Sequence, residues 1–140
     1  MTLDRRRFLR GAGSAAFAGS HLFAQSGPRL AIVLDPRDPV ATAAPARWAA
    51  EQLRATGEAR GLRAVVLENP EARQAGDLFV LGAGPSPAAL RAIASSRLSL
   101  SEIPESLAIV PAQEGVLACG RDVRALVYAL LELADRVRHA

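Results

Sequence analysis

The sequence predicts a single α/β domain: a small mixed sheet of about five strands with about three helices. Three observations support this fold class. The chain has 140 residues, 50% of them hydrophobic and 22% charged, which suits one globular domain. From residue 27 onward, short apolar runs alternate with segments of helical periodicity. The last of these segments carries a continuous apolar stripe, which predicts a helix lying across the sheet.

The apolar runs have the length and composition of buried strands. The first, residues 30–34, is bounded by Pro28 before it and by Pro36 and Pro39 after it. The last two runs are separated by residues 111–115, and a connection of this length that contains glycine predicts an antiparallel hairpin. The expected strands are residues 30–34, 62–67, 77–81, 107–110 and 116–119.

Capping residues mark where two helices begin. The first helix is expected from residue 43 to about residue 59, with Thr42 as its N-cap and Pro45 in its first turn. The second is expected to begin at Pro87, after Ser86 as its cap, and to end in a serine pair. A polar loop, residues 68–76, precedes the third strand.

The C-terminal helix has the clearest signal in the chain. Asp122 is a good N-cap, and residues 123–137 follow it with apolar side chains at helical spacing. Glu132 and Arg136 form a favourable i,i+4 pair on the polar face. This helix is expected to carry much of the core.

The excess positive charge lies entirely in the first 26 residues. All 17 basic residues are arginines, and four of them stand in this segment against one aspartate. The remaining residues, 27–140, hold 13 arginines and 13 acidic residues. The predicted domain therefore offers no net positive field for phosphates, which excludes nucleic acid as a partner.

Residues 1–26 resemble a twin-arginine signal peptide. Arg5 and Arg6 form the pair, Phe8 and Leu9 follow, and a weakly apolar stretch of small residues comes next. That stretch is too short and too rich in Gly and Ser to span a bilayer. The resemblance implies that the twin-arginine translocase is a partner during export and that the mature domain, residues 27–140, is periplasmic or secreted. The alternative is a basic amphipathic first helix of a cytosolic protein.

Few residues could carry catalysis. The histidines are His21, near the N-terminus, and His139, the penultimate residue, which argues against a Ser-His-Asp triad or a histidine metal site. Cys119 is the one cysteine and lies within an apolar run, where a buried thiol is expected rather than a nucleophile. No catalytic residue, metal ligand or cofactor-binding residue is therefore predicted.

Two loop motifs admit a functional interpretation and a structural one. Gly82-x-Gly84 follows a strand and precedes a helix, as in dinucleotide-binding turns, but Pro87 stands where the third glycine belongs. A tight strand-to-helix turn is the expectation. Asp35 and Asp38 follow the first strand, and paired carboxylates can transfer protons or hold a cation. Solvated loop acids are the favoured interpretation.

The aromatic residues of the predicted domain give no carbohydrate signature. Trp48, Phe79 and Tyr128 are too scattered along the chain to identify a platform for stacking sugar rings. Aromatic residues make up only 4% of the chain. This composition argues against a carbohydrate-binding module that depends on exposed rings.

Residues 106–137 resemble the end of the small α/β domain that precedes the (β/α)8 barrel in several glycoside hydrolase families. These include the α-glucuronidases, with their N-terminal domain, and the β-N-acetylhexosaminidases, with their domain 2. The resemblance rests on a hairpin, the turn Gly120-Arg121-Asp122 and the helix segment 128–133. It extends in the expected order over most of residues 30–138. Ala125 and Ala129 depart from it, since family members often have Gly there.

The resemblance implies an exported, non-catalytic accessory domain of a carbohydrate-degrading enzyme. The acids that cleave glycosides in those families belong to the barrel, so no residue here inherits a catalytic role. We expect a truncated or split chain whose partner is a barrel domain, in cis or in trans. The alternatives are a free-standing periplasmic module that binds a small ligand, such as an anion at residues 82–87, and a small hydrolase that uses carboxylates alone.

Overall fold

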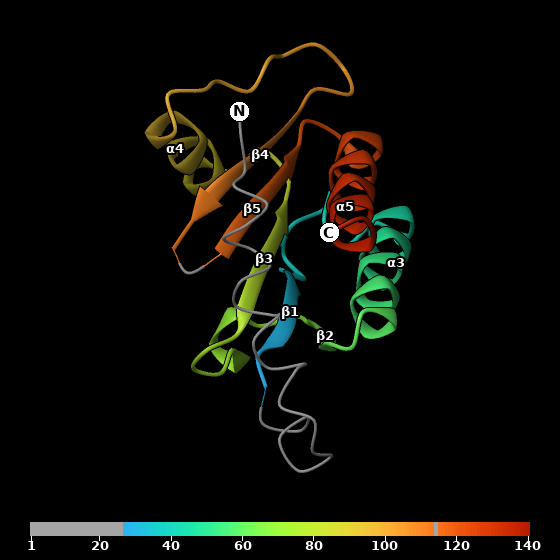
Figure 1. The fold of residues 1–140 in the computed structure, drawn as a ribbon. Helices are drawn as coiled ribbons and strands as arrows, with labels where there is room; N and C mark the ends of the chain where they lie inside the picture. The colour runs from blue at the N-terminus through green and yellow to red at the C-terminus, as the bar shows by residue number, and fades with distance from the viewer. Residues whose placement is uncertain (1–26, 114) are drawn as a thin grey trace.

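A computed structural model describes residues 27–113 and 115–140. Within these residues, a five-stranded sheet has the order β2-β1-β3-β5-β4. The strands β1, β2, β3 and β5 are parallel, and β4 is antiparallel to β5 (Figure 1). The predicted mixed sheet is confirmed. The strands are β1 (Arg29–Leu34), β2 (Arg63–Leu67), β3 (Leu78–Ala83), β4 (Leu107–Ala112) and β5 (Gly115–Gly120).

The export-signal prediction falls on Arg5, Arg6, Phe8 and Leu9, which lie outside the described residues. No helix within the described residues is both long enough and apolar enough to cross a bilayer.

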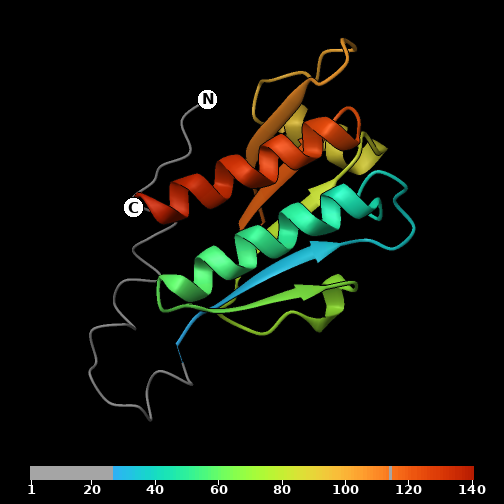
Figure 2. The same cartoon turned by 90° about the vertical axis from the view of Figure 1, so that its right-hand side faces the viewer.

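The three α-helices of the described residues cover the two faces of the sheet unequally. The helices α3 (Ala44–Ala59) and α5 (Val123–Arg138) lie side by side on one face (Figure 2). The helix α4 (Pro87–Ser95) covers β4 and β5 on the opposite face. The short 3-10 helix η1 (Pro70–Ala72) lies in the connection from β2 to β3.

Strand alternation divides the core into two parts, because successive side chains point to opposite faces. Leu30, Ile32 and Leu34 of β1 belong to the larger core, under α3 and α5. The smaller core, under α4, is built from residues of α4, β3, β4 and β5 together with Leu100. The apolar stripe predicted on the last helix is confirmed, and its buried residues are Ala125, Leu126, Ala129, Leu130, Leu133, Ala134 and Val137.

The predicted hairpin is confirmed, but its connection is shorter than expected. β4 continues to Ala112 and includes Pro111, and β5 begins at Gly115. Pro111 has no backbone N–H to donate to a neighbouring strand. It is tolerated because β4 is an edge strand, which pairs with a strand on one side only. Gly115 lies opposite Phe79 of β3, whose backbone carbonyl a Cβ at this position would overlap.

Two of the three predicted helix caps are confirmed. The Ser86 hydroxyl accepts a hydrogen bond from Ala89 N at 3.1 Å, and the Asp122 carboxylate accepts one from Ala125 N at 2.9 Å. The Thr42 prediction is wrong. Ala43 is the N-cap of α3 without a side-chain bond, because the Thr42 hydroxyl donates instead to the backbone oxygen of Asp38 at 2.9 Å.

The connection from β2 to β3 is fastened to the sheet by arginines. Arg29 on β1 forms a partly buried ion pair with Asp77 at 2.8 Å and also donates to the Ala72 oxygen. The Arg73 guanidinium lies 4.3 Å from the ring centroid of Phe79. Asp77, expected to begin the third strand, lies one residue before β3 because its carboxylate binds Arg29 and the backbone N of Gln74.

Candidate functional site: a crevice at the carboxyl ends of β1 and β3

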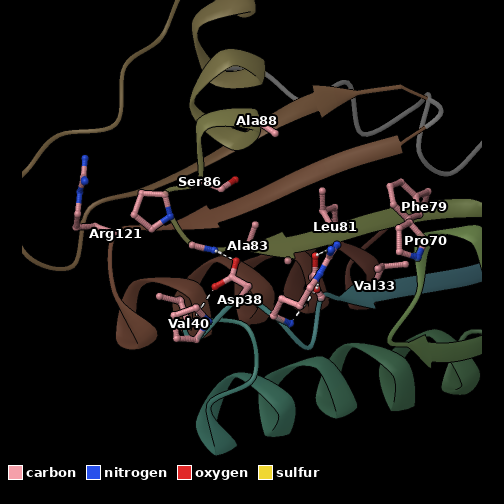
Figure 3. Close-up of a pocket in the computed structure, with 16 residues that line it drawn as sticks. Val33, Asp38, Val40, Pro70, Phe79, Leu81, Ala83, Ser86, Ala88 and Arg121 are labelled. Atoms are coloured by element: carbon pink, nitrogen blue, oxygen red, sulfur yellow. Dashed lines mark hydrogen bonds and ion pairs between the residues drawn. The ribbon is translucent and has the colours of Figure 1, made fainter.

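The adjacent strands β1 and β3 send the chain to opposite faces of the sheet. After β1 the chain continues into α3, and after β3 it continues into α4 on the other face. In open α/β sheets such a switch point leaves a crevice at the carboxyl ends of the strands, where ligands commonly bind. A cavity of about 820 Å³ lies at this place (Figure 3).

The crevice has an apolar floor and a narrow polar rim. Val33 of β1 and Phe79 and Leu81 of β3 line it, with Pro70 and Ala88 approaching from η1 and α4 (Figure 3). The polar residues in its lining are Asp35, Arg37, Asp38, Ser86 and Arg121. An apolar pocket with a few polar groups is the usual form of a small-molecule site.

Asp38 ties the two sides of the crevice together. One carboxylate oxygen accepts from Val40 N at 2.9 Å and from Ala41 N at 3.2 Å. The other accepts from Gly84 N at 2.7 Å, across 46 residues of sequence. The expectation of a solvated loop acid is therefore wrong for Asp38. Its side chain is half-buried and satisfies backbone donors that would otherwise lack partners.

Asp35 has a different partner and remains near the surface. It accepts from Arg37 Nε at 3.1 Å and from Arg37 N at 2.8 Å, and the Arg37 side chain is almost fully exposed. These hydrogen bonds and the arginine charge hold the pKa of Asp35 below its usual range. The two aspartates thus bind separate partners rather than acting as a carboxylate pair.

The two glycines of the Gly82-x-Gly84 motif make room for side chains. Gly82 lies within β3 rather than in the turn, and a Cβ there would lie 2.7 Å from Leu34 Cδ2. A Cβ at Gly84 would lie 2.9 Å from the Val40 Cβ and 3.1 Å from an Asp38 oxygen. Close packing accounts for both glycines. The tight strand-to-helix connection that the sequence predicts is present as residues 84–86, where Ser86 N donates to the Gly84 oxygen at 2.8 Å.

Cys119 lies behind the crevice and is fully buried. Its thiol donates to the Gly84 oxygen at 3.5 Å. Burial, reinforced by the nearby charge of Asp38, raises the pKa of Cys119 to about 11. The thiol is therefore protonated at neutral pH and is a poor nucleophile, as the sequence predicts.

Arg121 and the start of α4 offer the crevice few polar groups that could bind a ligand, because these groups already have partners in the chain. The Arg121 guanidinium donates to the backbone oxygens of Leu100 and Ser101, at 3.1 and 3.0 Å. Ser86 uses its hydroxyl to cap α4, and Pro87 has no N–H to offer. Within residues 27–113 and 115–140, no three His, Cys, Asp or Glu side chains gather where a metal ion could bind.

Comparison with known proteins gives a structural similarity but no sequence match. No family model matches the sequence, and no curated protein matches it. Among solved structures, the chain is similar to a GH138 enzyme targeting pectin rhamnogalacturonan II, with a TM-score of 0.55 and 13% identity. The match covers 81% of this chain and 14% of that chain. At this identity the similarity shows the fold alone: a fold also present in a glycoside hydrolase.

Proposed function

We propose that this chain is an exported, non-catalytic accessory domain of a carbohydrate-degrading glycoside hydrolase of the α-glucuronidase or hexosaminidase type. In this proposal a barrel domain, joined to it or separate, carries the catalytic acids. The observation that carries the proposal is the match of nearly the whole domain to a small part of a glycoside hydrolase chain. This chain spans 14% of the length of that enzyme, so any activity of the complete enzyme belongs to the proposal alone.

The chemistry of the crevice supports a non-catalytic role. Asp38 uses both carboxylate oxygens on backbone donors, Asp35 binds Arg37, and Cys119 keeps its proton. An acid–base catalyst needs a group poised to exchange protons near the working pH. The groups around the crevice are instead engaged in holding the β1–α3 and β3–α4 connections together.

The test is an activity assay of the purified full chain on a panel of aryl glycosides. We expect no turnover above that of a heat-denatured sample. Sustained turnover that disappears when one of the chain's own carboxylates is replaced would contradict the proposal. The reading frame after codon 140 provides an independent test, since we expect it, or a neighbouring gene, to encode a barrel.

A second candidate function is a free-standing module that binds a small ligand. The crevice at the switch point favours it, because this is where open α/β sheets commonly bind ligands. A thermal-shift screen with inorganic phosphate and with acidic and neutral monosaccharides separates the two candidates. An accessory domain should show no shift, and a concentration-dependent rise in melting temperature would favour the binding module.

A further inference from the structure

The aromatic residues of the described domain are distributed in an unusual way. Phe79 is the only one of the three in residues 27–113 and 115–140 that is buried. Trp48 is 53% exposed and Tyr128 is 49% exposed. Aromatic side chains normally supply much of the buried area of a core, but here aliphatic residues and alanines fill the core.

Trp48 and Tyr128 both stand on the outer side of the helix layer. The helices α3 and α5 begin at the same edge of the sheet and run in the same direction (Figure 2). Each aromatic residue lies in the second turn of its helix. The buried residues of both helices face the sheet, so the exposed rings project from the opposite side.

A groove of about 530 Å³, lined by apolar side chains and by the Glu132–Arg136 ion pair, adjoins Tyr128. It runs between α5 and the edge strand β4, and Leu98 and Leu107 line it together with Tyr128. These two leucines are 38% and 40% exposed. We use the name helix-layer surface for the groove residues Tyr128, Leu98 and Leu107 together with Trp48 on the neighbouring helix α3. This surface holds four of the six large apolar side chains that are exposed in the described residues.

The segment that carries Leu98 is held in place by the turn between β5 and α5. Arg121 donates to two backbone oxygens of this segment, and Asp122 accepts from Glu105 N at 2.9 Å. Arg124 forms an ion pair with Glu105 at 2.6 Å. The groove is therefore formed in advance of binding, which lowers the entropic cost of association.

Most of the charged side chains around this surface are paired within the chain, and Arg47, beside Trp48, is the exception among them in the described residues. Arg54 bridges Glu51 and Glu58 along α3, and Arg136 binds Glu132 along α5. A surface that binds nucleic acid or anionic lipid needs an excess of positive charge, and these pairs supply none. Exposed Trp and Tyr beside apolar side chains, with mostly paired charges around them, match the composition of a protein–protein interface.

The neighbouring sheet edge is unsuited to pairing with another strand. β4 is the edge strand, and Pro111 removes one of its backbone donors. A partner would therefore be held by side-chain packing on the helix layer rather than by extension of the sheet.

We propose that the helix-layer surface is where the catalytic module of a glycoside hydrolase packs, with an apolar side chain of that module in the groove beside Tyr128. This inference rests on the proposed function. In the GH138 enzyme the matching segment is 14% of the chain, so a domain of this fold is joined there to a much larger remainder. The Trp and Tyr rings supply the apolar anchors that such an interface needs.

The experiment measures binding between the full chain and the barrel encoded after codon 140 or by a neighbouring gene, expressed separately. Variants Trp48→Ala and Tyr128→Ala are compared with Leu90→Ala, a control on α4 whose side chain is 38% exposed on the opposite face of the sheet. We expect each aromatic variant to raise Kd about tenfold or more and the control to change it less than about twofold. Circular dichroism and melting temperatures check that every variant folds.

Two outcomes overturn the inference while the proposed function stands: the barrel binds both aromatic variants as tightly as the wild type, or Leu90→Ala weakens binding more than they do. Self-association of the wild-type chain in analytical ultracentrifugation, lost in both aromatic variants, would assign the surface to a second copy and also overturn it. If no barrel is encoded nearby, or the barrel does not bind the wild type, the proposed function fails and the inference fails with it.

Discussion

At the scale of single residues, the Asp38 carboxylate stabilises the crevice by accepting hydrogen bonds from backbone amides. Asp38 reaches from the segment after β1 to the turn after β3 and accepts from Gly84 N. The same glycine offers its carbonyl to the Cys119 thiol. One side chain and one thiol thus join the ends of three neighbouring strands.

Replacing Asp38 with Ala should destabilise the fold by about 1–3 kcal/mol, because the amide of Gly84 and those of Val40 and Ala41 lose their acceptor. Urea unfolding followed by circular dichroism measures the change. The matched control is Asp35→Ala, which removes an exposed pair with Arg37 and should leave the midpoint nearly unchanged. Equal midpoints for Asp38→Ala and the wild type would show that the three hydrogen bonds contribute nothing.

Cys119 should resist alkylation in the native state. Its pKa of about 11 lies above that of an unfolded thiol, so iodoacetamide at pH 8 should react slowly until urea unfolds the chain. The folded state holds the thiol proton more tightly, so stability is complete below the unfolded pKa and falls as pH rises from about 9 towards 11. A Cys119→Ala variant should lack this alkaline component. Rapid native alkylation would contradict the buried position.

At the scale of elements, local signals decide where helices begin. Ser86→Ala should cost about 1 kcal/mol, because Ala89 N loses its capping acceptor at the start of α4. Ser95→Ala is a suitable control, since the Ser95 hydroxyl donates back to the Arg91 oxygen within the same helix and caps no amide. Equilibrium unfolding in urea compares the two. A smaller loss for Ser86→Ala than for Ser95→Ala would exclude the capping role.

The turn from β5 into α5 depends on a residue without a side chain. A Cβ at Gly120 would overlap the backbone nitrogen of Leu126, which cannot move without shifting α5. Gly120→Ala should therefore destabilise the fold by about 3 kcal/mol, in the upper range for overpacked sites. Differential scanning calorimetry gives the change in melting temperature. Gly61→Ala is the comparison, since its Cβ would meet open space and only its positive φ of 84° opposes the change.

At the scale of the whole molecule, the charge distribution separates a basic segment, residues 1–26, from residues 27–140, whose charges balance. The sequence predicts that Arg5 and Arg6 are a twin-arginine pair, and both lie in the part of the chain before the described residues. The double variant Arg5→Lys, Arg6→Lys should keep the full-length chain in the cytoplasm, because the receptor reads this pair. Cell fractionation with immunoblotting measures the distribution. Arg7→Lys, at the variable position, should be exported normally, and export of the double variant would exclude the twin-arginine route.

Much of the architecture was predictable from the sequence because its causes are local. Short continuous apolar runs define strands, an apolar stripe defines α5, and Ser86 and Asp122 cap the amides three residues ahead. The prediction was wrong for Thr42, whose hydroxyl donates to the Asp38 oxygen instead of capping α3. It was also wrong for the environment of Asp38, whose carboxylate binds Gly84 N instead of facing solvent. Composition and neighbouring residues therefore determined the fold class and most element boundaries.

Only the tertiary structure decided how distant segments meet. The strand order places β3 between β1 and β5, so Asp38, Gly84 and Cys119 come together from three parts of the chain. The same arrangement brings Trp48 and Tyr128 to one side of the helix layer, although they are far apart in the sequence. Apolar periodicity predicts which face of an element is buried, but it does not predict which element covers that face. The pairing of elements depends on contacts between residues that are far apart in the sequence and close in space.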